Sequence, residues 1–387
     1  MKCLQKIRFL RPLEWSLVGA MALALMACGG NDDPPAPAST TTVLSAALSG
    51  DQEVTPTLTG ALGTGTLSLV SPSRALSGSI SLDGLTATDA HIHLGDTGVN
   101  GAIIVPLTQT VPGTWSVPTG TTLTEAQAAA FAAGGLYFNA HSTANPGGEI
   151  RGQIGREVFA AQMSSAQEVP GTASTATGNG LVSFDPTTKK FTARVTLTGL
   201  AATAAHIHTG TLGVNGPVLF GLTQTAPASG VWVAAADAVL TDAQLAALKS
   251  GGLYFNAHST ALPGGEIRGQ IARNVRFAGL SAADEVPANA SAATGSGTLV
   301  IDPATRVASG SISLTGMTAT AAHIHLGAAG SNGPVIVPLS NTAGNVWAVP
   351  ANTVLSADQF RAYKQGNLYY NAHSVALPAG EIRGQIR

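Results

Sequence analysis

Leu-Tyr-Phe-Asn-Ala-His, at positions 136–141, is the stretch that indicates the fold most clearly. Apolar and polar side chains alternate along it, which is typical of a β-strand with one face in a hydrophobic core. The leucine, phenylalanine and alanine are expected on the core face, and the tyrosine, Asn139 and His141 on the other. The stretch therefore predicts a strand that has one apolar face and one face rich in hydrogen-bonding groups.

A short helix and a hairpin are predicted upstream of this strand. Thr124 and Gln127 have the spacing of a capping box, and Gly134-Gly135 ends the helical segment about ten residues later. Residues 64–70 and 75–82 are short runs with partial alternation, and a turn containing Pro72 separates them. Two such runs joined by a turn are typical of an antiparallel hairpin.

The strand belongs to a unit that occurs three times. An upstream His-Ile-His segment that begins at His91 returns at His206 and at His323, after 115 and then 117 residues. This period exceeds the roughly 20–50 residues of solenoid repeats, so each unit is expected to have its own core. The chain is therefore predicted to be all-β, with three tandem antiparallel Greek-key-like β-sandwich or barrel domains, each with one short helix. Their predicted bounds are 43–155, 156–273 and 274–387.

The first 42 residues indicate export. Residues 1–27 have a basic start and then an apolar run that is short for a membrane span, as in a signal peptide. The run ends in Leu-Met-Ala-Cys28, which resembles the lipobox of bacterial lipoproteins and implies a lipid on Cys28. Gly29 follows the cysteine; an Asp there would favour the inner membrane, so the outer membrane is expected. Residues 28–42 are predicted to be a flexible tether.

Charge and cysteine content exclude several kinds of protein. Without residues 1–27, the chain has 15 basic and 20 acidic residues, a net charge of −5. Nucleic-acid binding requires a basic surface, so no nucleic-acid partner is expected. The two cysteines, Cys3 and Cys28, lie in the leader and at the predicted lipidation site. The predicted domains therefore contain no thiol for a disulfide or for a metal ligand.

The nine histidines of the chain fall three to a repeat. A His-x-His pair on a strand places two imidazoles on one face, and a third from a neighbouring strand would complete a three-nitrogen site with an open position. Imidazole is a common ligand of copper and zinc, so one such ion per repeat is a candidate cofactor. The candidate ligands are His91, His93, His141, His206, His208, His258, His323, His325 and His373.

Neighbouring polar residues could orient these rings through hydrogen bonds. The candidates for this second shell are Glu149, Glu266, Glu381, Asn139, Asn256 and Asn371. A metal-free alternative stays open, in which the histidines and their neighbours satisfy one another across adjacent strands. In that alternative Glu149 and Arg151 form a surface ion pair of little energetic value. The pattern does not decide whether Glu53 is exposed or part of the polar cluster.

Three blocks of each repeat resemble the CHRD domain, a family named after chordin. In the first repeat they are Ala-His-Ile-His at 90–93, Leu-Tyr-Phe-Asn-Ala-His-Ser at 136–142 and Pro-Gly-Gly-Glu-Ile-Arg-Gly-Gln at 146–153. The resemblance runs from about Val43 to Arg387 and implies an extracytoplasmic β-rich module without a settled activity. It does not imply growth-factor binding, because the cysteine-rich modules of chordin are absent. There is also a distant likeness to copper/zinc superoxide dismutase, a Greek-key barrel with a His-x-His pair.

Three functions are compatible with these features. The first is a non-catalytic binding or structural module of the cell envelope, anchored to a membrane by lipid on Cys28, that binds one transition metal per repeat and an extracytoplasmic ligand or protein. The second is a metal-dependent enzyme, either superoxide-dismutase-like or hydrolytic. The third is a metal-free adhesin or matrix protein. Neither a catalytic residue nor an organic cofactor is assigned.

Overall fold

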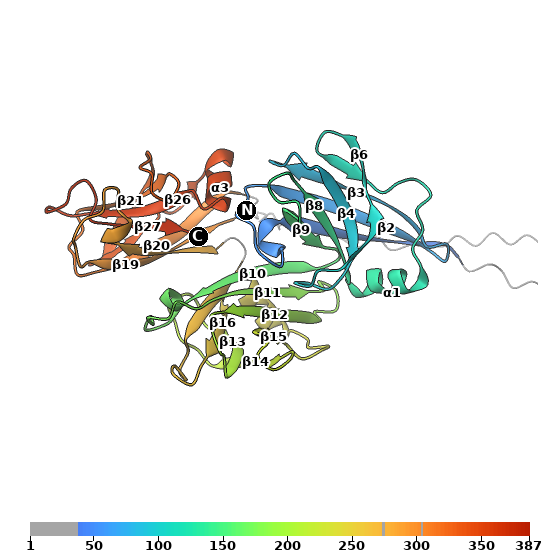
Figure 1. The fold of residues 1–387 in the computed structure, drawn as a ribbon, viewed down its shortest axis with the longest axis horizontal. Helices are drawn as coiled ribbons and strands as arrows, with labels where there is room; N and C mark the ends of the chain where they lie inside the picture. Colours follow the sequence, from blue (N-terminus) through green and yellow to red (C-terminus); the bar gives the residue numbers. More distant parts are fainter. Residues whose placement is uncertain (1–37, 273–274, 303–304) are drawn as a thin grey trace, which may run out of the picture. The chain divides into compact units, whose positions relative to one another are not determined.

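The structure of the chain is a computed structural model that describes residues 38–272, 275–302 and 305–387 (Figure 1). The predicted signal peptide at 1–27, the lipidation site Cys28 and most of the predicted tether lie outside the described residues. Within the described part, no helix has both the length and the apolar character to cross a membrane.

Three β-domains follow one another along the chain, and each has one short helix. The first contains β1 (Thr40–Ser49), β2 (Leu62–Ser71), β3 (Ala75–Asp83), β4 (Asp89–Leu94), β5 (Ala102–Pro106), β6 (Thr108–Val111), β7 (Thr114–Ser116), α1 (Glu125–Ala133), β8 (Leu136–His141) and β9 (Ile150–Gln153). The second contains β10 (Glu157–Ser164), β11 (Thr177–Phe184), β12 (Phe191–Thr198), β13 (Ala204–Thr209), β14 (Val218–Gln224), β15 (Val231–Val233), α2 (Asp242–Lys249), β16 (Leu253–His258) and β17 (Ile267–Ile271). The third contains β18 (Val275–Ser281), β19 (Thr294–Ile301), β20 (Val307–Thr315), β21 (Ala321–Leu326), β22 (Val335–Pro338), β23 (Ser340–Ala343), β24 (Val346–Ala348), β25 (Thr353–Val354), α3 (Ala357–Lys364), β26 (Leu368–His373) and β27 (Ile382–Ile386).

All strand pairs are antiparallel, and the strand order is the same in each domain. In the second domain the order β10-β11-β12-β15-β14-β13-β16-β17 closes into a barrel. The connection from β12 to β13 passes over two strands that follow later in the sequence, which is a Greek-key arrangement. The predicted fold class of three tandem all-β domains with one helix each is therefore confirmed.

One strand of the barrel is broken in the first and third domains for a simple chemical reason. His206 pairs with Gly221 on the continuous strand β14, whereas His91 pairs with Pro106 at the end of β5. The third domain has Pro338 at the same position. Proline has no N–H to give to the ladder, so the strand divides there into β5 and β6, or β22 and β23.

The local predictions for helix and hairpin are confirmed. Strands β2 and β3 form an antiparallel hairpin with continuous register. Thr124 accepts a hydrogen bond from the N–H of Gln127, and the Gln127 side chain accepts one from the N–H of Thr124. Gly134 then ends α1 in the left-handed conformation, with φ of 72°.

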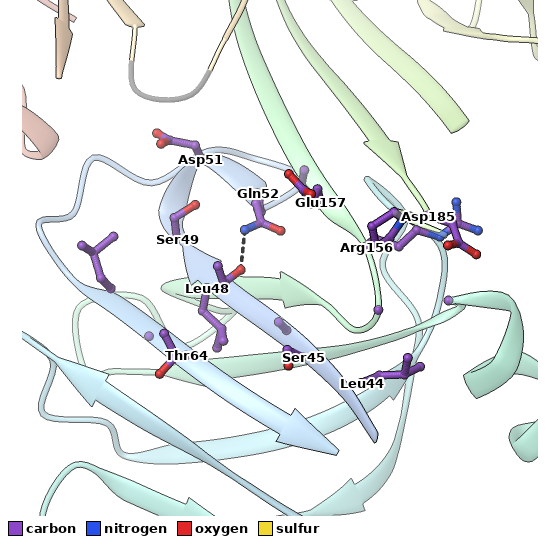
Figure 2. Close-up of a pocket in the computed structure, with 18 of the residues that line it drawn as sticks. Leu44, Ser45, Leu48, Ser49, Asp51, Gln52, Thr64, Arg156, Glu157 and Asp185 are labelled. Carbon is purple, nitrogen blue, oxygen red and sulfur yellow. Dashed lines mark hydrogen bonds between the residues drawn. The ribbon is translucent and has the colours of Figure 1, made fainter. Parts of the chain in front are cut away.

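The first strand begins earlier than predicted, at Thr40. Thr40, Thr41 and Thr42 pair with the end of β2, in a region that we expected to be tether. Threonine is β-branched and favours strand geometry, so this run continues the ladder of β1. After β1, a turn at Gly50–Gln52 redirects the chain, and Figure 2 shows the Gln52 side chain returning to donate to the Ala47 carbonyl at 2.7 Å.

Both faces of the strand β8 are buried. Leu136, Phe138 and Ala140 lie in the hydrophobic core, as the alternation predicts, together with Ile92. Tyr137 and Asn139 on the other face are also almost fully buried. The hydrogen-bonding face of the sheet is therefore covered, and its cover forms part of the candidate site.

Candidate metal centre

The histidines of each domain lie on one polar face formed by three adjacent strands. In the first domain, His91 of β4 pairs with Asn139 of β8, and His93 pairs with Tyr137. His141, at the end of β8, lies across from Asp89. Because side chains alternate along both strands, all of these groups project from the same side of the sheet.

Each domain brings its three histidines together. One ring nitrogen from each of His91, His93 and His141 lies within 4.8 Å of the other two. The same holds for His206, His208 and His258, and for His323, His325 and His373. The upstream pair and the downstream histidine are about fifty residues apart in sequence, and the pairing of β4 with β8 joins them.

Main-chain carbonyls fix the proton position on two rings of each cluster. His93 Nδ1 lies 3.0 Å from the Gly101 carbonyl oxygen, and His141 Nδ1 lies 3.1 Å from that of Pro146. A carbonyl oxygen only accepts, so Nδ1 donates in both rings, and Nε2 of the neutral ring carries the lone pair. The second and third domains repeat both contacts.

Two other nitrogens of the cluster face each other. His91 Nδ1 lies 3.1 Å from His141 Nε2, and the corresponding distances are 3.0 Å and 3.1 Å in the other domains. Nε2 of His93 is buried and has no hydrogen-bond partner among the described residues; the same is true of His208 and His325. A buried lone pair without a donor recurs in all three domains, and such a group normally has a hydrogen-bond donor or a bound ion as its partner.

Burial favours the neutral rings. Desolvation lowers the pKa of His93 below its ordinary value, and the hydrogen bond to the Gly101 carbonyl offsets only part of this decrease. Desolvation also lowers the pKa of His141, and of the corresponding His258 and His373. A neutral imidazole is the form that coordinates a metal, so burial favours the ligating form of these rings.

A single family accounts for nearly all of the described chain. The family model of the CHRD domain matches residues 44–154, 159–271 and 276–386. The chain belongs to the CHRD family. A search of the curated proteins found no match.

The Arg-Gly-Gln segment of each CHRD domain anchors a loop over the polar face, a role that the sequence analysis missed. Arg151 donates to the carbonyls of Asp96 and Val99, at 2.7 and 2.8 Å. Gln153 donates to the Gly95 carbonyl at 2.8 Å. The loop 95–101 is therefore fastened at several points, and its last residue supplies the carbonyl that holds His93.

The metal-free alternative supposed that Arg151 forms a surface ion pair with Glu149, but Arg151 is buried. Its side chain is 1% exposed, and its guanidinium lies 3.4 Å from the centroid of the Tyr137 ring. The His93 ring stacks on the same tyrosine, at 4.8 Å between centroids and 13° between planes. Tyr137 thus contacts a cation and a candidate ligand, and its hydroxyl also accepts a hydrogen bond from the Gly101 N–H.

The glutamates and asparagines that we expected to orient the rings have other partners. Glu149 accepts from the hydroxyls of Thr59 and Ser142, and not from a ring N–H. Asn256 and Asn371 donate to Glu168 and Glu285, at 3.4 and 3.3 Å. Carbonyl groups of the loops take the role that we expected of Glu149, Glu266, Glu381, Asn139, Asn256 and Asn371. The contacts that orient His93 and His141 come from main chain, which leaves no signature in side-chain types.

Glu53 is buried beside Asn139, and its counterparts Glu168 and Glu285 are buried in the same way. Burial raises the pKa of Glu53 to about 7, although Arg151 and Asn139 oppose the shift. Gly148 packs so tightly here that a Cβ on it would lie 2.9 Å from Glu53 Oε1. Burial therefore favours the protonated carboxyl below a pH of about 7.

We expect replacement of these three glutamates by glutamine to stabilise the chain at pH 8 and to leave it unchanged at pH 4.5. A carboxyl whose folded pKa lies above its unfolded value of 4.5 contributes a penalty that appears as pH rises from about 4.5 to 7 and is constant above it. The gain at pH 8 should be of the order of 2 kcal/mol in each of the first two domains, and the third should change in the same direction because burial also raises the pKa of Glu285.

Urea unfolding of the unaltered chain and of the Glu53→Gln, Glu168→Gln, Glu285→Gln variant, across this pH range, measures the difference. The histidines are common to both chains, so the difference isolates the glutamates. Glu125→Gln, an exposed position in α1, is the matched control. If the difference in unfolding free energy between the two chains does not change with pH, the buried glutamates do not have raised pKa values.

Proposed function

We propose that the chain is a binding protein of the cell envelope in which each CHRD domain holds one transition-metal ion through its three histidines. The observation that carries the proposal is the buried Nε2 of His93, His208 and His325, which lacks a donor in all three domains. Buried lone pairs of this kind are costly unless they are satisfied, and a metal ion satisfies them.

The spacing of the facing nitrogens, which suits a hydrogen bond, also suits two ligands of one metal ion. Two nitrogens bound at about 2.0–2.1 Å to one Zn²⁺ lie about 3.4 Å apart at a tetrahedral angle, and about 2.9 Å apart at a right angle. The separation of His91 Nδ1 and His141 Nε2, 3.1 Å, lies between these values. Copper and zinc are the ions that best fit three imidazole donors.

Three neutral donors leave coordination positions free on a copper or zinc ion. His141 is only partly buried, so a water molecule or a donor group of a partner can approach the ion from that side. We therefore propose a binding role, in which the ion links the domain to an extracytoplasmic ligand. A metal-dependent activity, superoxide-dismutase-like or hydrolytic, is the second candidate that the free position favours.

Anchoring by lipid on Cys28, at the outer membrane, would place the three domains on one tether. Weak affinities multiply when several sites act on one chain, because the later binding steps are intramolecular. The proposed location rests on the lipobox resemblance and on the apolar run before it. Radiolabelled-lipid incorporation in the host, lost in Cys28→Ser, tests this part of the proposal.

Metal analysis of the purified chain tests the proposal itself. We expect three copper or zinc ions per chain after reconstitution and dialysis. The variant with alanine at His93, His208 and His325 should retain less than a tenth of an ion, with its fold intact by circular dichroism. An unaltered chain that retains no metal would contradict the proposal and leave the metal-free adhesin. Metal-dependent turnover in superoxide or ester-hydrolysis assays would favour the enzyme.

A further inference from the structure

The three histidine clusters differ in the residue that lies across from the downstream histidine. Asp89 begins β4 in the first domain, whereas Ala204 and Ala321 occupy the same register position, across from the downstream histidine, in the other two. Asp89 Oδ2 lies 3.0 Å from His91 Nε2. A methyl group cannot accept a hydrogen bond, so His206 and His323 lack this contact from that position.

The Asp89 carboxylate is itself held in place. Its other oxygen, Oδ1, accepts from the N–H of Ala90 at 2.9 Å. This contact orients the carboxylate, so that Oδ2 faces the ring of His91. The His91 ring is largely buried, whereas about half of the Asp89 side chain is exposed. The pair therefore lies at the edge of the site, where a fixed carboxylate can act on the ring without itself being desolvated.

This carboxylate changes which nitrogen of His91 carries the proton. A carboxylate only accepts, so His91 Nε2 donates to it, and the lone pair of the neutral ring lies on Nδ1. Nδ1 then faces the lone pair of His141 Nε2 at 3.1 Å. Two facing lone pairs repel each other until a cation lies between them. The first cluster is thus arranged for a metal ion before the ion arrives.

The other two clusters can satisfy the same pair of nitrogens internally. Without a carboxylate at Ala204, His206 is free to carry its proton on Nδ1 and to donate it to His258 Nε2, at 3.0 Å. His323 and His373 can do the same at 3.1 Å. A metal ion must break this hydrogen bond and move the proton to the other nitrogen before it binds.

We infer that the first domain is the high-affinity metal site of the chain and that Asp89 is the residue that makes it so. The inference rests on the proposed function and adds an order of filling, in which the first domain loads before the second and third. A carboxylate hydrogen-bonded to a ligating histidine raises metal affinity about 10- to 100-fold. Asp89 is half exposed, so an increase near the lower end, about tenfold, is expected.

Competition titrations of Zn²⁺ against a chromophoric chelator test the inference on the full chain. We expect one ion to bind about tenfold more tightly than the other two. In Asp89→Ala, the three sites should bind Zn²⁺ with equal affinity. In Ala204→Asp, two sites should bind tightly and one weakly. Glu125→Ala, which removes one negative charge from helix α1 of the same domain, is the matched control and should leave the two classes unchanged.

The outcomes separate the inference from the proposed function. Three ions bound with equal affinity in the unaltered chain would overturn the role of Asp89 and leave metal binding intact. Tight binding that survives Asp89→Ala would also overturn it. Binding of no ion at all would overturn both. Two double variants assign the tight site to a domain. The chain with His208→Ala and His325→Ala should keep the tight site, and the chain with His93→Ala and His325→Ala should lose it.

Discussion

A chain in which His93 alone is replaced by alanine is expected to bind two metal ions where the unaltered chain binds three. His93 supplies the buried Nε2 that has no other partner, and its Nδ1 is already used by the Gly101 carbonyl. Loss of one of three donors should weaken metal binding in the first domain at least 100-fold, because the two remaining nitrogens then form an incomplete ligand set.

The consequence for stability follows from linkage. An ion at about 100 times its dissociation constant stabilises the domain that binds it by roughly 2.7 kcal/mol. Metal should therefore protect the second and third domains of the His93→Ala chain against urea, and not the first. Hydrogen exchange resolved by peptide distinguishes the three domains, and the unaltered second and third clusters are internal controls. Retention of three ions would show that His93 is not a ligand.

Arg151→Met is expected to destabilise the first domain by about 3 kcal/mol. The guanidinium is almost fully buried, and it holds two loop carbonyls and the Tyr137 ring. Methionine keeps much of the apolar volume, but it leaves those carbonyls without donors, and Glu53 loses its neighbouring positive charge. Breaking a buried charged contact in this way costs several kcal/mol.

The effect of Arg151→Met should be local. Amide hydrogens of the loop 95–101 should exchange faster, while those of 210–216 and 327–333 should not change. Arg151→Lys keeps the charge but not the planar guanidinium with its several donors, so it should restore only part of the lost stability. Lys190→Met, which removes an exposed cation, should change stability by less than about 0.5 kcal/mol. Unaltered exchange in the loop would contradict its anchoring by Arg151.

Much of the fold was predictable because its signals are local. The alternation in 136–141, the capping box at Thr124 and the hairpin at 64–82 depend on neighbours within a few residues, and all three are present. The threefold repeat then supplied the domain count. The start of β1 at Thr40 was missed, because a run of threonines has no alternation to separate a strand from a tether.

For the site, the sequence predicted only that the three histidines of a repeat come together. Period two placed His91 and His93 on one face, and the pairing of β4 with β8 brings in His141. The partners of His93 and His141 were not predictable, because the carbonyls of Gly101 and Pro146 come from main chain. The roles of Arg151 and Gln153 were missed for a related reason. Their targets are backbone oxygens of a loop more than fifty residues away.

X-ray absorption on the zinc-loaded chain tests the central claim most directly, because it counts the nitrogens around the ion. The account predicts three imidazole nitrogens at about 2.0 Å with one further light atom, and the loss of this signal in the chain that lacks His93, His208 and His325. A spectrum with one imidazole or none, or one that is unchanged in that variant, would contradict a three-histidine metal centre in the CHRD domains.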